Sequence, residues 1–412
     1  MVHRPSMLKR VHWLLLPGLL LVVVLALGLR RHVMARLAAG GTISVLVEVL
    51  SEDASADSGN AKQAIADVLE SFRRYNPDAE VRWSMVHTSE FDQRLDFLQR
   101  RGLAPDLMLV LNTDLLALRA RGQIEPVELT VQERANIRPA LVNALEMDGL
   151  GLGIPYVVFT GLACFDRQHL PEAPQSLDAL IDLAKQETTI GLPSSFSELW
   201  WIYTGFNPQD SDAIELPTPE NLKRFLRWLR LANLQPAIAF EADAEQLRRG
   251  LSSGRYQWIA CNNRWLPSLQ SQLGPRLGRG VLPSGPAGPP QPLVQMRIWT
   301  FGRQSSHRQR ELARRLATFS TNLVQQRTLA LKLGSVIPVN PGIALPLKAY
   351  PLIALQEQQY RRGTLLNLQQ FAALERLNLP AQPLLNAVIS GNQSPEVIAP
   401  LLMAVLEQEV KP

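Results

Sequence analysis

The serine within Gly250–Gly254 is the first residue whose type and spacing suggest chemistry, because this stretch matches the GxSxG pattern of nucleophilic serines. In that pattern a strand leads into the serine and a helix follows it, which holds the hydroxyl at a sharp turn. Here the order is reversed, since residues 244–249 have a helical composition and the apolar run 256–261 is typical of a strand. The sequence therefore predicts that Ser252 is not a nucleophile.

Motifs for metal, phosphate or cofactor chemistry do not occur in the sequence. The six histidines show neither an HExxH pattern nor another paired ligand spacing, and no GxxxxGKS or GxxxxGKT loop is present. The glycine-rich run 149–153 lacks GxGxxG spacing and is typical of a turn. A glycoside-active enzyme would need two carboxylates roughly 5–10 Å apart, and Glu52 with Glu198 is the one pair we can suggest. We expect no enzymatic activity, no cofactor and no metal.

Strand and helix patterns alternate along the chain from residue 42. Segments 42–50, 79–86 and 106–111 have the composition of strands, and each is followed by apolar residues at helical spacing. Such alternation predicts an α/β protein with a mostly parallel sheet and helices on both faces. Ligands of such sheets gather at the carboxyl ends of the strands. Those ends lie near Glu52 and near Asn112–Thr113.

Composition and charge exclude several classes of protein. The 412 residues are 46% hydrophobic and 19% charged, with 30 prolines, which excludes a disordered, collagenous or coiled-coil protein. Their number fits two lobes of ordinary size. The net charge of +5 arises in residues 1–35, because the rest of the chain carries equal numbers of bases and acids. A neutral body argues against nucleic acid as a partner.

An uncharged apolar run covers residues 13–29 and has basic residues on both sides. The run is long enough for the core of a signal peptide and just long enough to span a bilayer. We therefore expect residues 1–36 to be a signal peptide or a membrane anchor that places the body outside the membrane. Two arginines directly after the run are unusual for a cleaved signal and slightly favour an anchor.

The two cysteines, Cys164 and Cys261, each lie in an apolar run typical of a strand, with no CxxC motif and no histidine partner. Free cysteines are among the residues most often buried in protein cores. We expect two buried thiols, with a disulfide bridge as the alternative.

Four landmarks occur in a set order along the chain. They are Pro105–Met108 ahead of Gly122, Gly153–Tyr156 leading to Cys164–Arg167, Gly254–Ile259 leading to Asn263–Trp265, and Leu333–Val339. In this order and spacing the chain resembles the extracellular solute-binding proteins of family 1, the sugar-type, maltose-binding-protein-like receptors of bacterial ABC importers. The resemblance covers residues 42–412. It departs from the family at Val110 and Thr113, where a Trp and an acid are expected.

The resemblance implies the two-lobe, type II periplasmic-binding-protein fold, with a ligand cleft between the lobes that closes by hinge motion. The first lobe is expected at 42–157 and 294–343, and the second at 160–292 and 346–412, after an N-terminal hydrophobic helix. A second alternation of strands and helices, which begins after Pro155, fits this division.

Candidate ligand contacts lie in loops that the pattern places at strand ends or that match contact loops of the family. Sugars present C–H faces and hydroxyl edges, so their sites need flat aromatic surfaces and a few convergent polar groups. We expect Trp265 to be a stacking platform whose ring is partly exposed in the empty protein. The full set is Glu52, Asn112, Thr113, Phe159, Thr160, Ser195, Phe196, Glu198, Trp200, Trp201, Asn263 and Trp265.

The function implied by the resemblance is that of a transport receptor. It would bind a sugar or another polyhydroxylated solute and deliver it to an ABC permease driven by a separate ATPase. We expect a monomer on the periplasmic side of the bacterial cytoplasmic membrane, attached through residues 13–29 or secreted. One alternative is a membrane-anchored solute sensor or scavenger module without an importer, and a neighbouring permease gene would discriminate between the two. An exported glycoside-active enzyme is a third reading.

Overall fold

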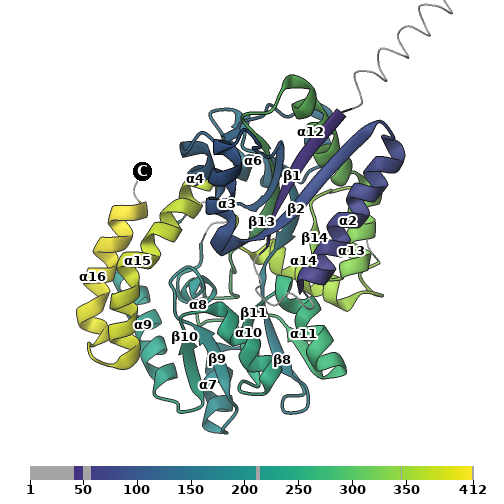
Figure 1. Cartoon of the computed structure of the whole chain (residues 1–412). Helices are drawn as coiled ribbons and strands as arrows, with labels where there is room; N and C mark the ends of the chain where they lie inside the picture. The colour runs from purple at the N-terminus through teal and green to yellow at the C-terminus, as the bar shows by residue number, and fades with distance from the viewer. Residues whose placement is uncertain (1–40, 50–56, 210–213, 345, 411–412) are drawn as a thin grey trace, which may run out of the picture.

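The computed structural model describes residues 41–49, 57–209, 214–344 and 346–410. Two β-sheets, each covered by helices, make up most of this part of the chain, one above the other in Figure 1. The signal or anchor expected at 1–36, with its apolar run 13–29, lies outside the described residues. Within the described residues, no helix is both long and apolar enough to cross a bilayer.

The first sheet consists of β1 (Gly41–Val49), β2 (Ala79–His87), β3 (Leu107–Leu111), β4 (Ile124–Glu125), β7 (Ile154–Phe159), β13 (Gln295–Gly302) and β14 (Ile337–Pro338). Its order is β14-β7-β13-β3-β1-β2, with β4 paired to β13. β1 runs parallel to β2 and β3, as the alternating pattern predicts, whereas β13 runs antiparallel to β3 and β7. Every residue of β3 is buried, because helices cover both faces of the sheet at this central strand.

The second sheet consists of β8 (Gly161–Asp166), β9 (Ile190–Pro193), β10 (Ile238–Glu241), β11 (Trp258–Asn262) and β12 (Leu277–Gly280), in the order β10-β9-β11-β8-β12. β9 is parallel to β10 and β11, and β8 is antiparallel to β11 and β12. A separate hairpin joins β5 (Glu146–Met147) to β6 (Leu150–Gly151). Its turn lies at Asp148–Gly149, so the glycine-rich run 149–153 is a turn only at its start, and Leu150–Gly151 form β6.

The helices that contribute to the first sheet's core include α2 (Asp57–Tyr75), α3 (Thr88–Arg100), α4 (Leu115–Ala120), α6 (Pro139–Leu145), α12 (His307–Ser320) and α13 (Leu323–Leu333), and the short α5 (Val131–Ala135) contacts α6. The apolar stripe from Leu312 to Leu323 belongs to two helices rather than one. α12 ends at Ser320, and the side chain of Asn322 caps α13 by accepting a hydrogen bond from the Gln325 N–H at 2.9 Å.

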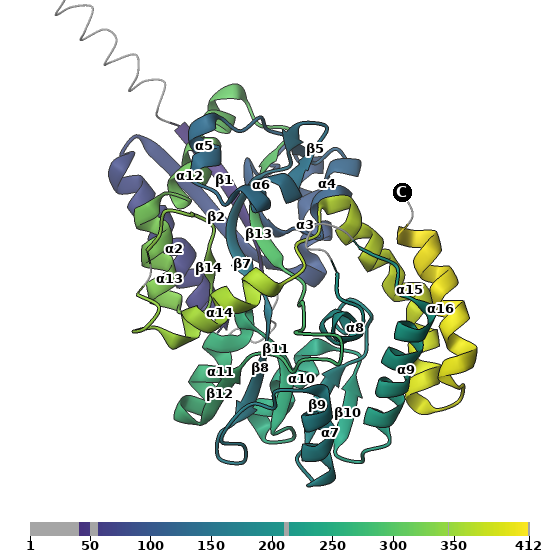
Figure 2. The ribbon, with the colours of Figure 1, turned by 180° about the vertical axis from the view of Figure 1, so that it is seen from behind.

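The second sheet is covered by α7 (Leu177–Lys185), α8 (Trp200–Phe206), α9 (Pro219–Asn233), α10 (Ala244–Ser253), α11 (Leu266–Leu273), α15 (Leu368–Ser390) and α16 (Pro395–Val410). Short 3₁₀ turns at Asn263–Trp265 and Gly274–Arg276 flank α11. α15 and α16 lie beside α9 in Figures 1 and 2. Gly254 caps the carboxyl end of α10, and the Ser252 hydroxyl donates to the Arg248 carbonyl of its own helix at 3.0 Å, so the GxSxG match is a helix end.

The chain passes between the sheets at three places. Thr160 separates β7 from β8, residues 281–294 lead from β12 to β13, and α14 (Pro351–Arg362) lies between the two sheets (Figure 2). The lobe ranges expected from the sequence stay a prediction. A hinge between the sheets would have to lie in these three connecting segments.

A disulfide joins Cys164 of β8 to Cys261 of β11, and the expectation of two buried thiols is wrong. In the antiparallel register Cys164 lies opposite Ile259, two residues before Cys261 on the same strand. Residues two apart in a strand share a face, so both sulfurs lie on one face of the sheet, and the Cα atoms are 5.6 Å apart. The sequence carries no local sign of this register.

Candidate functional site

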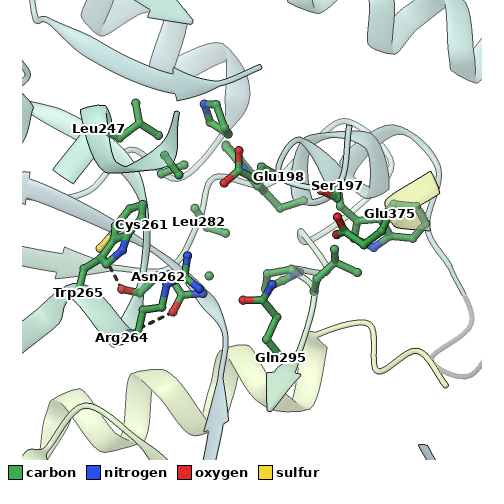
Figure 3. Close-up of a pocket in the computed structure, with 18 residues that line it drawn as sticks. Ser197, Glu198, Leu247, Cys261, Asn262, Arg264, Trp265, Leu282, Gln295 and Glu375 are labelled. Carbon is green, nitrogen blue, oxygen red and sulfur yellow. Dashed lines mark hydrogen bonds between the residues drawn. The ribbon is translucent and has the colours of Figure 1, made fainter. Parts of the chain in front are cut away.

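A cavity of about 110 Å³ lies at the carboxyl ends of β9 and β11, the kind of sheet edge where α/β folds collect ligands (Figure 3). Residues of α8, α10 and α15 and of the segment leading into β13 complete its wall. The lining residues are Gly161, Pro193, Ser197, Glu198, Trp200, Trp201, Ala244, Leu247, Ala260, Cys261, Asn262, Arg264, Trp265, Leu282, Pro292, Leu293, Gln295 and Glu375.

Three tryptophans of the expected set line this cavity, and all three are almost fully buried. Trp200, Trp201 and Trp265 expose 1%, 4% and 5% of their surface. The Nε1 of Trp200 donates to Oγ1 of Thr364 at 3.0 Å, and Trp265 packs in an apolar cluster with Leu247. The expectation of a partly exposed Trp265 ring is therefore wrong, because this ring belongs to a core as well as to the cavity wall. Its contact with a ligand stays a prediction.

Buried N–H groups without a hydrogen-bond partner in the described part of the chain occur on three lining residues. They are Nε1 of Trp201, Nε1 of Trp265 and Nε of Arg264. A buried donor without a partner costs roughly 1–3 kcal/mol. Hydroxyl oxygens of a bound solute are one kind of acceptor that would remove this cost.

Charged groups of both signs also line the cavity. Glu198 accepts a hydrogen bond from the Ser195 hydroxyl at 2.9 Å, and removal from water raises the pKa of Glu198. Glu375 keeps part of its side chain in solvent, yet desolvation and, to a smaller extent, the charge of Glu198 raise its pKa. Burial lowers the pKa of Arg264, which forms no salt bridge with a described residue. Figure 3 shows Arg264 and Glu375 on opposite sides of the cavity.

A second polar cluster occupies the carboxyl edge of the first sheet and is centred on Glu48 of β1. This side chain is 1% exposed and accepts hydrogen bonds from Oγ1 of Thr88 at 2.7 Å and from the Leu111 N–H at 3.1 Å. Burial and then the charge of Glu48 raise the pKa of Asp114 to about 7. The charge of Glu48 also raises the pKa of Arg264 against the effect of burial. The edges of the two sheets therefore lie close enough to interact.

Other residues of the expected set lie around the cavity rather than in its wall. Asn112 is buried, and its Oδ1 accepts a hydrogen bond from the Met296 N–H at 3.0 Å, which ties the end of β3 to β13 within the first sheet. Thr113 is half-buried at the same edge. Phe159, at the end of β7, is buried in the core of the first sheet.

Residues of the loop before α8 line the cavity and also support the side chains of its wall. Ser195 holds the Glu198 carboxylate, and Phe196 is fully buried against Trp200, with ring centroids 6.2 Å apart. Glu52 lies outside the described residues. The pair of Glu52 and Glu198 suggested for an enzyme therefore stays untested.

Asn263 and Thr160 belong to a buried network that joins the cavity to α14. The Oδ1 of Asn263 accepts a hydrogen bond from the Thr160 N–H at 3.0 Å, and its Nδ2 donates to Oε1 of Gln356 at 3.3 Å. Gln356 in turn donates to the carbonyl of Gly334, at the end of α13, at 2.9 Å. The Asn263 amide thus connects the β11 edge to the helix between the sheets.

Sequence reasoning did not select five polar lining residues. Three of them are immediate neighbours of selected residues in the same loops, so a wider window around those loops would have found them. The other two come from β13 and α15, far along the chain, and no local pattern marks them. The five residues are Ser197, Asn262, Arg264, Gln295 and Glu375.

Replacement of Asp114 by Asn should remove a pH dependence of stability. The pKa of Asp114 is about 7 in the folded chain and about 3.9 when unfolded. The folded state therefore binds more protons between these values, and its free energy of unfolding falls as pH rises from about 4 to about 7, by at most about 1.4 kcal/mol per pH unit. Urea unfolding of wild type and Asp114→Asn at pH 4.5, 6 and 7.5 measures this difference. Parallel pH curves for the two proteins would contradict the assignment.

Comparisons with known proteins show no relative by sequence. No family model matches the chain, and no curated protein matches it. Solved structures match closely in fold. The GacH receptor of Streptomyces glaucescens aligns over 90% of this chain and 98% of its own, with a TM-score of 0.75 and 16% identity. The maltose-binding periplasmic protein MalE of Listeria monocytogenes aligns over 90% and 97%, with a TM-score of 0.70 and 16% identity.

The MalE maltose/maltodextrin-binding domain of Bdellovibrio bacteriovorus covers 90% of this chain and 100% of its own, with a TM-score of 0.71 and 18% identity. The chain has the two-lobe periplasmic-binding-protein fold. The fold class expected from the sequence is thus confirmed for the described residues, and the N-terminal hydrophobic helix stays a prediction. All three matched proteins are described as receptors or binding proteins. At these identities the match shows the fold, and the function rests on the site.

Proposed function

We propose that this chain is the extracytoplasmic substrate-binding component of an ABC importer and that it binds a sugar or another polyhydroxylated solute. The observation that carries the proposal is the set of three unpaired buried donors, on Trp201, Arg264 and Trp265, around one cavity that also holds the carboxyl groups of Glu198 and Glu375. Structures of this fold in complex with acarbose, maltose, maltotriose and tagatose support the choice of solute class.

The chemistry of the cavity suits hydroxyl groups. A sugar hydroxyl donates one hydrogen bond and accepts others, so it can pair with a carboxylate and with an N–H at the same time. Glu198 and Glu375 supply acceptors, Arg264 and the two indoles supply donors, and the indole rings offer flat apolar surface to C–H groups. A solute without hydrogen-bond acceptors would leave these donors buried and unpaired.

Transport requires that the bound solute be recognised by a membrane partner, and hinge closure is a general way to signal occupancy. In the proposed mechanism the edge of the first sheet, with Glu48 and Asp114, closes over the cavity as the segments around Thr160 and α14 bend. The closed form then presents both lobes to an ABC permease driven by a separate ATPase. We place the protein as a monomer on the periplasmic side of the membrane, anchored or secreted.

A thermal-shift screen tests the proposed function. The protein is heated with millimolar maltose, maltotriose, acarbose, tagatose and a panel of monosaccharides and polyols. A solute at 100 times its dissociation constant stabilises the folded state by roughly 2.7 kcal/mol, which raises the melting temperature by several degrees. Small-angle scattering with the best solute should then show a smaller radius of gyration. Absence of stabilisation by every saccharide and polyol would refute the proposed solute class.

A further inference from the structure

A second and larger cavity, of about 400 Å³, lies between the two lobes, apart from the lining of the proposed solute site. α2 and α13, which pack on the core of the first sheet, form one side, and α11 and β12 of the second sheet form the other. α2 and α11 touch beside it. Its lining residues are Gln63, Leu266, Pro267, Gln270, Arg279, Lys332, Leu333, Ser335 and Leu352.

The charges of this cavity are of one sign. Arg279 comes from β12 and Lys332 from α13, and the described lining contains no carboxylate. Lys332 also pairs with Asp67 of α2, outside the lining. Arg279 forms no salt bridge with a described residue, and its Nε is buried without a hydrogen-bond partner. One cation of the cavity is therefore without a counter-charge.

The surroundings of Arg279 oppose its charge. Burial and the neighbouring charge of Arg167 both lower the pKa of Arg279. A buried donor that is charged costs more to leave unpaired than a neutral one, because it loses its hydration without compensation. A guanidinium presents its N–H groups as a planar fork that matches the oxygens of a carboxylate, a phosphate or a sulfate. An anion with such oxygens would supply both a counter-charge and a hydrogen-bond acceptor for Arg279.

We propose that this interlobe cavity is a second ligand site, which binds a small oxyanion between Arg279 of the second lobe and Lys332 of the first. The site is separate from the proposed sugar cavity, because the two share no lining residue. The polar side chains of Gln63, Gln270 and Ser335 provide further hydrogen-bond donors for the oxygens of the anion.

The test uses inorganic phosphate and citrate as probes, without any sugar, on the purified chain. Melting temperature is followed against each anion at constant ionic strength, set with sodium chloride. We expect a saturable rise of a few degrees that chloride does not reproduce. In Arg279→Gln the apparent affinity should fall at least tenfold. Arg249→Gln, which alters an exposed arginine of α10 outside both cavities, should keep the wild-type response.

Lys332→Gln provides a second variant in case Arg279→Gln does not fold, and it should also weaken the response. Absence of a saturable shift in wild type, or an equal shift in wild type and both cavity variants, would overturn the proposal. Failure of the sugar screen leaves this measurement unaffected, so the two proposals succeed or fail separately.

Discussion

Replacement of both Cys164 and Cys261 by Ala should lower the free energy of unfolding by about 4–5 kcal/mol. The disulfide closes a loop with a sequence separation of 97 residues. Without it the unfolded chain gains conformational entropy, and for a loop of this length the gain is worth about 4–5 kcal/mol. Alanine is small and apolar, so the buried positions receive no unpaired polar group. Urea unfolding of the oxidised wild type and of the double variant measures the difference.

Reductant serves as the control for the disulfide. It should bring the wild type close to the double variant and leave the double variant itself unchanged. Loss of the disulfide should also change the solute cavity, because Cys261 lines the cavity and β11 positions Asn262 at its edge. Equal stability of oxidised wild type and double variant would show that the bridge does not stabilise the fold by restricting the unfolded chain.

Trp265→Ala should cost roughly 3–5 kcal/mol of stability, the usual loss when a buried tryptophan is truncated. Only 5% of its surface is exposed, and the ring packs in the cluster that includes Leu247 and Leu269. Solute affinity should fall as well, because the same residue lines the cavity. Trp265→Phe is the matched control: it keeps an aromatic ring but lacks the Nε1 donor, so it should retain more stability than Trp265→Ala.

Melting temperature and solute affinity are measured on both Trp265 variants. A small stability loss in Trp265→Ala would contradict the role of this ring in the core. Full solute affinity in Trp265→Phe would show that the unpaired Nε1 donor is not used by the solute.

The alternation of strands and helices was enough to predict the parallel part of the first sheet, and the two-lobe fold was predicted from the family resemblance. Period and composition are local properties, and β1, β2 and β3 match the ranges that they indicate to within one residue at each end. The disulfide was not predictable, because it depends on the register of β8 against β11, strands that lie far apart in sequence. The end of α12 was missed because Asn322 caps the next helix within one continuous apolar stripe.

The candidate site was predictable where it follows a strand and unpredictable where it depends on packing. Glu198 and Trp265 lie in loops after strands of the second sheet, and both line the cavity. Glu375 reaches the same cavity from α15, a helix whose docking no local pattern reveals. Glu48 lies inside an apolar strand, where a carboxylate is unexpected until the N–H of Leu111 and the hydroxyl of Thr88 are seen to pair with it.

Calorimetric titration of the best saccharide from the screen into wild type and Arg264→Gln tests the central claim most directly, namely that a saccharide binds at this cavity. Loss of a hydrogen bond to a charged group costs about 1.5–3 kcal/mol, so the dissociation constant should rise roughly 10- to 150-fold. The melting temperature of the Arg264→Gln variant without solute should not fall. Burial disfavours the charged form of Arg264, which has no salt bridge within the described part of the chain, so removal of this charge should cost no stability. Arg249→Gln should match wild type. An unchanged dissociation constant in Arg264→Gln would contradict the account.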